Sequence, residues 1–266
     1  MVVKSTKKRI EANFSRASTT YDSFARMQNQ AADLLLTHVG LACASLQKGT
    51  ILEIGCGTGQ MSAEISRLLG SRKLIFSDIS VRMVEQCQQK IEKLRTPPND
   101  FQCTILDAEQ LSDKNAYAAV ISGLTVQWFS DFQQTLHRVY DSLIPGGEFI
   151  FSCLVQGSFA QWYSASNRLN VPCTANLLPN SAKINQEVAT VFDSLESVSK
   201  SIEIEYPSTD YFFRSLKLTG TNAQKDGLVL TAGQMRRLIR GWELSLKGET
   251  LKMTYVFDIL RAKKKR

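Results

Sequence analysis

The fold of this chain is decided by the stretch Ile51-Leu52-Glu53-Ile54-Gly55-Cys56-Gly57-Thr58-Gly59. Its first residues are mainly apolar, which is typical of a buried parallel strand. Three alternating glycines follow, and a helical pattern starts at Gln60. Glycine allows positive φ and close approach of a ligand, and the start of a helix has free N–H groups. The stretch therefore predicts a ligand site; a tight turn without a ligand is the alternative, but such a turn rarely needs three glycines.

Two classes of cofactor compete for this turn. A dinucleotide site needs the spacing G-x-G-x-x-G, and Gln60 occupies the place of its third glycine. Glu53 ends the strand, where a carboxylate repels a phosphate but attracts an ammonium or sulfonium group. The segment from Glu53 to Gly59 resembles motif I of the class I S-adenosylmethionine-dependent methyltransferases.

Length and hydropathy restrict the class of protein. The 266 residues, 43% of them hydrophobic, suit one large α/β domain with an inserted lid. No apolar run approaches the roughly 18–20 residues of a membrane span, and the basic N-terminus lacks the apolar segment of a secretory signal. We expect a cytoplasmic protein with no membrane partner.

The spacing of the cysteines and the net charge restrict which metals and macromolecular partners are expected. The six cysteines form no C-x-x-C pair and there are two histidines, so no metal site is expected. The net charge of +7 indicates either solvated tails or attraction to an acidic partner such as nucleic acid or an acidic carrier protein. Part of the positive charge lies at the two ends of the chain, in Lys4, Lys7, Lys8, Arg9, Arg261, Lys263, Lys264, Lys265 and Arg266.

Strand and helix patterns alternate from residue 50 onward, which predicts a parallel sheet with helices on both faces. The expected strands are 50–54, 73–77, 101–106, 117–122 and 148–154. We expect a single domain with a helical N-terminal extension (1–47), a cofactor-binding core (48–155), helical lid insertions (156–197 and 208–250) and closing strands (198–207 and 251–262).

The polar residues at the strand ends matter most, because ligands of open parallel sheets lie beyond the carboxyl ends of the strands. Asp78 lies 19 residues after Gly59, where a carboxylate can accept both ribose hydroxyls. It could instead cap the next helix, although Ser80 is better placed to do so. Asp107 or the Ala108 N–H is expected to contact adenine. The predicted cofactor site comprises Glu53, Gly55, Cys56, Gly57, Gly59, Asp78, Ile79, Met83, Asp107, Ala108 and Leu124.

Further segments extend the resemblance over nearly the whole chain. They are Phe14-Ser15-Arg16-Ala17-x-x-x-Tyr21-Asp22, Val126-Gln127-Trp128, Leu154 to Ser158, Arg214-Ser215-Leu216-Lys217-x-Thr219-Gly220, Leu230-Thr231 and Thr254-Tyr255. With them the chain is similar to the malonyl-acyl carrier protein O-methyltransferases of biotin synthesis. The basic termini and Cys56 depart from that pattern. The resemblance implies a Rossmann-like class I methyltransferase sheet of seven mostly parallel strands with an antiparallel closing strand.

The resemblance also implies the reaction: methyl transfer from S-adenosylmethionine to the free carboxylate of a malonyl thioester on an acyl carrier protein or coenzyme A. A carboxylate is already ionised at pH 7, so neither a strong base nor a metal is needed. His38 and His137 are accordingly interpreted as surface or packing residues. Arg214 and Lys217 are the candidates to hold the substrate carboxylate, Arg214 being favoured for its forked guanidinium.

The remaining substrate contacts are also expectations from this resemblance. Tyr21 and Gln156 are expected to complete the pocket by hydrogen bonding, and Trp128 to form a wall. The basic cluster Arg236-Arg237-x-x-Arg240 is a candidate docking face for an acidic carrier, although charge runs are usually only solvated.

Other functions stay open from the sequence. Another small-molecule carboxylate or amine methyltransferase would share the same core. The net charge also suits an RNA methyltransferase or a nucleic-acid binder, but no interleaved aromatic and basic pattern and no N-P-P-Y motif supports it, so nucleic acid is not expected as a partner. Gln60 and Glu53 argue against an NAD-dependent oxidoreductase.

Overall fold

A seven-stranded sheet forms the centre of the computed structural model, which describes residues 2–222 and 228–265. Across the sheet the strand order is β3-β2-β1-β4-β5-β7-β6. The first five strands are mutually parallel, and β7 is antiparallel to both neighbours. This confirms the expected fold class. The strands are β1 (Thr50–Ile54), β2 (Lys73–Asp78), β3 (Asp100–Ile105), β4 (Tyr117–Gly123), β5 (Leu143–Leu154), β6 (Ser194–Tyr206) and β7 (Leu251–Lys263).

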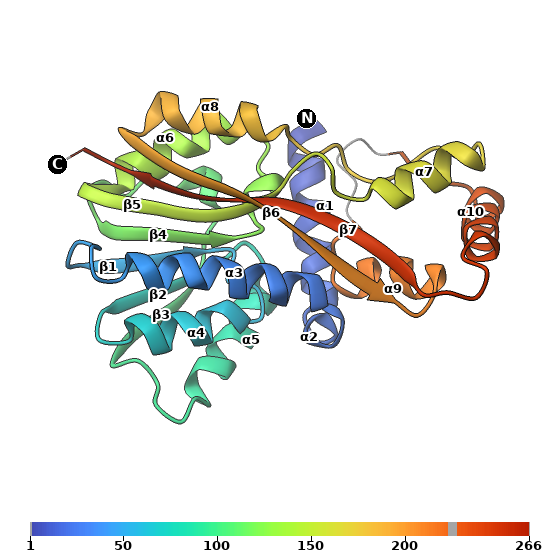
Figure 1. Cartoon of the computed structure of the whole chain (residues 1–266). Coiled ribbons are helices and arrows are strands. Elements are labelled where there is room, and N and C mark those ends of the chain that lie inside the picture. The colour runs from blue at the N-terminus through green and yellow to red at the C-terminus, as the bar shows by residue number, and fades with distance from the viewer. Residues whose placement is uncertain (1, 223–227, 266) are drawn as a thin grey trace.

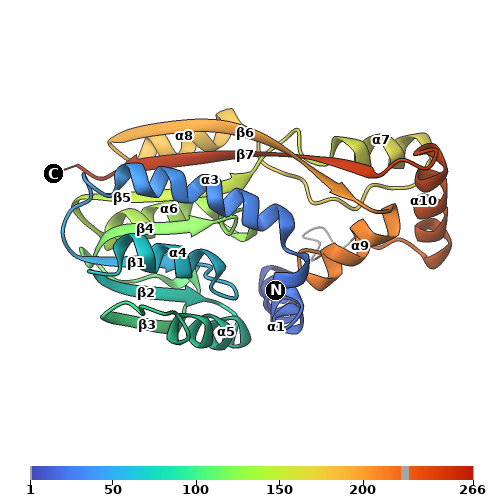
Figure 2. The ribbon, with the colours of Figure 1, turned by 60° about the horizontal axis from the view of Figure 1, so that its bottom comes forward.

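Helices cover both faces of the sheet, as the apolar central strands require. They are α1 (Val2–Ala17), α2 (Tyr21–Phe24), α3 (Arg26–Ala42), α4 (Gln60–Leu69), α5 (Val81–Glu92), α6 (Phe132–Ser142), α7 (Ala160–Arg168), α8 (Ser181–Val191), α9 (Thr209–Leu218) and α10 (Ala232–Ser245), with short 3₁₀ turns η1 (Ala108–Gln110) and η2 (Val126–Trp128). Figures 1 and 2 show α3, α4 and α5 on one face and α6 and α8 on the other.

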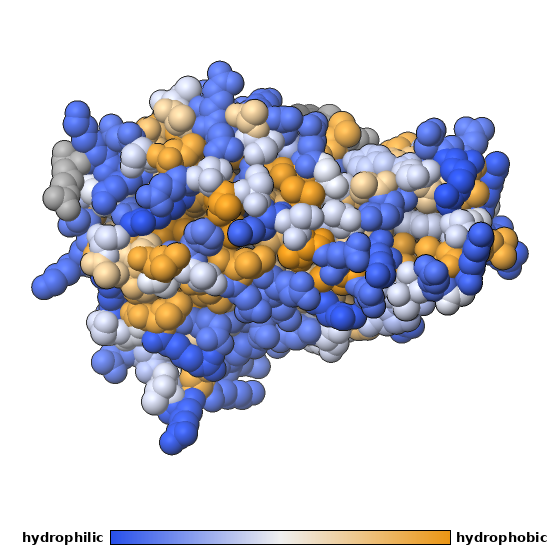
Figure 3. Space-filling view, in the orientation of Figure 1, coloured by the Kyte–Doolittle hydropathy of each residue, from blue (hydrophilic) through white to orange (hydrophobic). Residues whose placement is uncertain are grey.

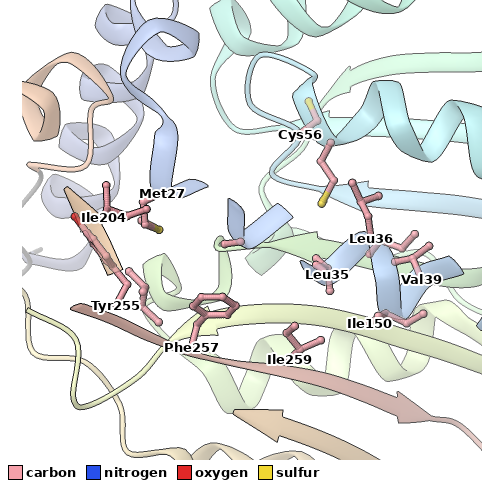
Figure 4. Packing of buried hydrophobic residues seen from close by; sticks show 14 of the residues in the cluster. Met27, Leu35, Leu36, Val39, Cys56, Ile150, Ile204, Tyr255, Phe257 and Ile259 are labelled. Carbon is pink, nitrogen blue, oxygen red and sulfur yellow. The ribbon is translucent and has the colours of Figure 1, made fainter. Parts of the chain in front are cut away.

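Helix α3 fixes the N-terminal extension to the sheet. Figure 4 shows Leu35 and Val39 of α3 beside Ile150 of β5 and Ile259 of β7. All four side chains are almost fully buried. Because α3 packs across the border between the parallel and antiparallel parts, the preceding helices α1 and α2 are held at the strand ends.

A second group of helices lies at one end of the molecule. Strands β6 and β7 extend past the other strands, and α7, α9 and α10 gather around that extension (Figures 1 and 2). Strand β6 begins at Ser194, earlier than the expected 198, because Ser194 already pairs with Lys263 of β7. The expected lid insertion 208–250 includes residues 223–227, which lie outside the described residues.

The basic C-terminal segment is not the solvated tail that its composition allowed. Arg261 and Lys263 of β7 both pair with Glu148, whose side chain is fully buried in β5. Lys264 donates to the carbonyl oxygens of Tyr140 and Leu143. These cations therefore join the closing strand to the parallel sheet; Arg266 lies outside the described residues.

Candidate functional site

The glycine turn after β1 is shaped by both packing and open space. Gly55, Gly57 and Gly59 have φ values of 77°, 53° and 86°, which L-residues rarely adopt. A Cβ on Gly55 would overlap the side chain of Thr125, and one on Gly59 would lie 2.9 Å from the Cα of Cys87. A Cβ on Gly57 would meet nothing within 4 Å. Gly55 and Gly59 therefore serve close packing, while Gly57 leaves free space above the turn.

Asp78, at the end of β2, is tied to this turn. Its Oδ2 accepts a hydrogen bond from the Gly57 N–H at 3.0 Å, and its Oδ1 accepts one from the Ser80 N–H at 2.8 Å. Burial raises the pKa of Asp78 to about 6 despite these hydrogen bonds, which lower it. Ser80 caps α5, accepting from the Met83 N–H, as the sequence indicated. Asp78 is thus left to present lone pairs to a ligand.

Glu53 and Gln127 provide buried acceptors without protein donors. The Glu53 Oε2 accepts from the Ser62 hydroxyl at 2.6 Å, while its Oε1 has no hydrogen-bond partner among the described residues. Burial raises the pKa of Glu53 well above its usual range. The Gln127 Nε2 donates to the Leu124 carbonyl, and its Oε1 is likewise unpartnered among the described residues. Unpaired buried acceptors are costly, so this pair fits a ligand that brings donors, such as an ammonium group.

These residues line one cavity of about 440 Å³ at the carboxyl ends of the parallel strands. Of the predicted cofactor residues it contains Glu53, Gly55, Cys56, Gly57, Asp78, Ile79, Met83, Asp107, Ala108 and Leu124. Gly59 is not in the lining, because it is the residue preceding α4 and packs on Cys87. The structure therefore brings together the strand-end residues that the sequence analysis grouped.

Helix α1 closes one side of the cavity and contributes Lys7, Ile10 and Phe14 to its lining. The Lys7 Nζ donates to Asp107 Oδ1 at 2.7 Å and Oδ2 at 2.6 Å, and it also pairs with Glu109. Sequence reasoning missed Lys7, because a lysine in a basic N-terminal run has no pattern that separates it from a solvated tail.

Helix α2 is linked to the glycine turn. The Asp22 carboxylate accepts hydrogen bonds from the Thr58 hydroxyl and from Lys90 of α5. Tyr21 lines the cavity next to it. Burial, together with the negative charges of Asp78 and Asp22, raises the pKa of Tyr21. Its hydroxyl consequently stays protonated at neutral pH and can donate a hydrogen bond into the cavity.

The residues predicted to contact the methyl-accepting substrate do not all lie in the cavity. Lys217 lines the cavity, and its side chain has no hydrogen bond or ion pair to any described residue. Trp128 also lines it, edge-on to Phe14 with ring centroids 5.5 Å apart. Lys217 and Lys7 are the two cations among the described lining residues, and Lys7 is already paired.

Two expectations need correction. Arg214 does not line the cavity, because α9 buries Phe212 in the core and position 214 lies on the opposite side of the helix; Lys217 is exposed as well, but it borders the cavity. Gln156 is exposed as well; its Oε1 accepts from Asn180, and its N–H donates to the Pro179 carbonyl. The geometry thus favours Lys217 over Arg214 and removes Gln156 from the pocket.

The cavity continues into an aromatic chamber that the sequence analysis did not assign. We use this name for the lining residues Phe24, Phe159, Trp162, Tyr206, Phe213 and Tyr255. The hydroxyls of Tyr206 and Tyr255 are hydrogen-bonded at 2.7 Å. The one sequence signal was the Thr254-Tyr255 pair, since the others are dispersed over 24–213 and look like ordinary core residues.

No group of three or more His, Cys, Asp or Glu side chains among the described residues is arranged to hold a metal ion. Nor is any helix in the described ranges long and apolar enough to cross a membrane.

Comparisons with known proteins find similar methyltransferases. Residues 51–147 match the family described as "Methyltransferase domain". A malonyl-[acyl-carrier protein] O-methyltransferase from Priestia megaterium is 26% identical over 94% of each chain. One from Ilyobacter polytropus is 29% identical over 79% of this chain and 73% of its own. The crystal structure of a putative methyltransferase from Bacillus halodurans superposes with a TM-score of 0.60 at 13% identity, covering 89% of this chain and 100% of its own, and so supports the fold.

Proposed function

We propose, from the premise that this chain belongs to the family of malonyl-[acyl-carrier protein] O-methyltransferases, that it methylates the free carboxylate of a malonyl thioester in the synthesis of biotin. S-adenosylmethionine is the methyl donor. The observation that carries the proposal is one cavity that holds, among the described residues, both the strand-end acceptors and an unpaired cation, Lys217.

The residues at the strand ends fit the donor. Asp78 is placed to accept the ribose hydroxyls, and the unpaired oxygens of Glu53 and Gln127 suit the ammonium of its methionine part. Asp107 and Ala108 also line the cavity, and in this proposal they contact the adenine. Open space above Gly57 allows the backbone to approach the ligand.

The reaction requires the protein to orient the two reactants and to exclude water from them. The donor, when bound, supplies a methyl group on a sulfonium sulfur; a carboxylate oxygen forms the new C–O bond as the C–S bond breaks, leaving a neutral thioether and an ester with no proton transferred. Lys217 and the Tyr21 hydroxyl hold the carboxylate, and Trp128 with Phe14 excludes water. Holding reactants in this way lowers the barrier by several kcal/mol, up to about 7–11 kcal/mol in well-oriented cases.

Lys217 is suited to this work by its position. It lies near the end of α9, where the Thr20 hydroxyl donates to the Leu218 carbonyl at 2.8 Å and so joins α9 to the α1–α2 junction. That joint brings Lys217 toward Tyr21, and both line the cavity. An exposed ammonium retains enough hydration to bind a carboxylate without forming the rigid two-pronged pair of an arginine, so the oxygen stays nucleophilic.

An acidic carrier protein is the partner that we propose for the α10 end of the molecule. Arg236, Arg237 and Arg240 are exposed on α10, and Met235 of the same helix lines the cavity. In Figure 3 hydrophilic side chains dominate the end that carries α10, whereas hydrophobic atoms lie in broken patches across the middle of the face. A carrier docked on these arginines would deliver its thioester arm past Met235, between lid insertions 156–197 and 208–250.

We further propose that the enzyme works in the cytoplasm. Each of its six cysteines is a free thiol. Reducing compartments preserve such thiols.

The test is a methyl-transfer assay with labelled S-adenosylmethionine and malonyl-acyl carrier protein, read by mass spectrometry as the gain of one methyl. Malonyl-coenzyme A, free carboxylic acids, amines and RNA are compared under the same conditions. Transfer to the malonyl carrier at a kcat/KM well above all others supports the proposal, and transfer only to an amine, an unrelated acid or RNA contradicts it.

Substitution of Lys217 tests the assignment of the acceptor cation. We expect Lys217→Ala to lower kcat/KM for the malonyl thioester by roughly tenfold or more, because a charged hydrogen bond contributes about 1.5–3 kcal/mol. Donor affinity, measured by calorimetry, should not change. Arg214→Ala, one turn earlier on the exposed face of α9, is the matched control and should retain activity. If instead Arg214→Ala loses activity and Lys217→Ala retains it, Arg214 is the cation that binds the acceptor carboxylate.

A further inference from the structure

We infer that the indole N–H of Trp162 holds the thioester carbonyl of the acceptor, an inference that rests on the proposed function. Trp162 lines the aromatic chamber and is 5% exposed. Its Nε1 is buried and has no hydrogen-bond partner among the described residues. An orphaned buried donor costs about 1–3 kcal/mol, so a ligand acceptor explains its retention.

The aromatic residues of the described chain that pack on Trp162 offer its indole N–H no hydrogen-bond acceptor. The ring meets Phe159, Phe212 and Phe213 edge-on, with centroid distances of 6.0, 5.5 and 5.1 Å. The hydroxyls of Tyr206 and Tyr255, also in this chamber, already bond to each other. Trp162 is therefore an unpaired donor in a mainly aromatic wall, which is the arrangement that selects one polar group of a ligand.

The position of Trp162 matches the chemistry of a malonyl thioester. Phe213, against which Trp162 packs, lies four residues before Lys217 on α9, so the two share a helix face about 5–6 Å apart. In the acceptor a single methylene separates the carboxylate from the thioester carbonyl. Lys217 then holds the carboxylate while the Trp162 indole donates to the thioester carbonyl. The hydrogen bond from Trp162 is thereby kept away from the carboxylate oxygen that attacks the methyl group.

The backbone before Trp162 is strained in a way that fixes this position. Phe159, the residue preceding α7, has a φ of 61°, a left-handed conformation that is costly for a bulky residue. Its N–H donates to the Thr254 carbonyl of β7, and its carbonyl accepts from the Trp162 N–H at 2.9 Å. The start of α7 is thus anchored to β7, next to Tyr255, and the indole is held at a fixed place in the chamber.

The experiment compares two acceptors in two enzymes. The first acceptor is malonyl-carrier protein, and the second is the carrier bearing a 2-carboxyethyl thioether, which keeps the carboxylate and lacks the carbonyl. For the native enzyme we expect kcat/KM to be about tenfold higher with the malonyl thioester. In Trp162→Phe this preference should shrink to near unity, through loss of activity on the malonyl thioester alone.

Controls separate the inference from general damage and from the proposed function. Trp242→Phe, which removes another buried indole that also packs on Phe212 and Phe213, should keep the tenfold preference. An equal loss on both acceptors in Trp162→Phe, or a native enzyme without preference, overturns the carbonyl assignment. A native enzyme that methylates neither acceptor refutes the proposed function itself.

Discussion

A single residue, Asp78, makes the site sensitive to pH. Its pKa, raised to about 6 by burial, lies between that of an ordinary aspartate and neutrality. The carboxylate accepts hydrogen bonds from two backbone N–H groups, and we propose that it accepts the ribose hydroxyls too. Protonation of Asp78 reduces the number of hydrogen bonds that its carboxyl group can accept.

We therefore expect affinity for S-adenosylmethionine to fall as the pH drops through about 6 and to be level above 7. The sign follows from the raised pKa: the proton binds in the acid range, and the protonated form accepts fewer hydrogen bonds. Calorimetric titration of the native enzyme between pH 5 and 8, where ordinary aspartates stay ionised, measures it. Asp78→Asn should bind more weakly at pH 7.5 and show a flatter profile; an unchanged profile in this variant would assign the pH dependence to another group.

Helix α1 forms one wall of the cavity and is tied to the strand ends by Lys7. Lys7 joins it to Asp107 and Glu109, while Asp22 of α2 holds Thr58 and Lys90. These two links attach the N-terminal extension to the core at both sides of the cofactor cavity. Lys7 occupies the acceptor oxygens of Asp107, so the link also governs which atoms of Asp107 a ligand reaches.

Loss of the Lys7 link should loosen α1. We expect Lys7→Ala to reduce hydrogen-exchange protection of residues 7–17 several-fold and to speed dissociation of S-adenosylmethionine, because a partly buried ion pair contributes on the order of 1 kcal/mol. Lys8→Ala removes the neighbouring exposed lysine and is the control. Equal exchange in the two variants would show that α1 is held by its apolar face alone.

The elements show which features the sequence could predict. Strand–helix alternation and the strand-end acids were predictable, because burial period and glycine spacing are local properties of the sequence. The cavity-facing side of α9 was not: Arg214 and Lys217 differ by three positions and are both exposed, and only the fold shows that Lys217 is the one beside the cavity. Lys7 and Trp162 join the site through contacts distant in sequence, for which a single chain carries no local signal.

At the scale of the whole molecule, the closing strand joins the two parts of the structure. Strand β7 pairs with β5 near its C-terminal end, and its beginning supports the aromatic chamber through Thr254 and Tyr255. Glu148 sits at the β5 side of this pairing and is fully buried, so its charge depends on the cations of β7. The stability of the sheet and the shape of the aromatic chamber are therefore coupled through one strand.

Substitution of Arg261 tests how far the stability of the sheet depends on this pairing. The Arg261 Nε and Nη2 donate to the two Glu148 oxygens at 2.7 and 3.0 Å. We expect Arg261→Ala to lower the free energy of unfolding by about 2–4 kcal/mol, somewhat below the full cost of breaking a buried pair, because Lys263 stays 3.3 Å from Glu148. Lys252→Ala, which removes an exposed cation of the same strand facing Glu203 and Glu205, should cost about 0–1 kcal/mol. Urea denaturation of both variants measures the difference, and equal midpoints would show that solvent and Lys263 satisfy Glu148 without Arg261.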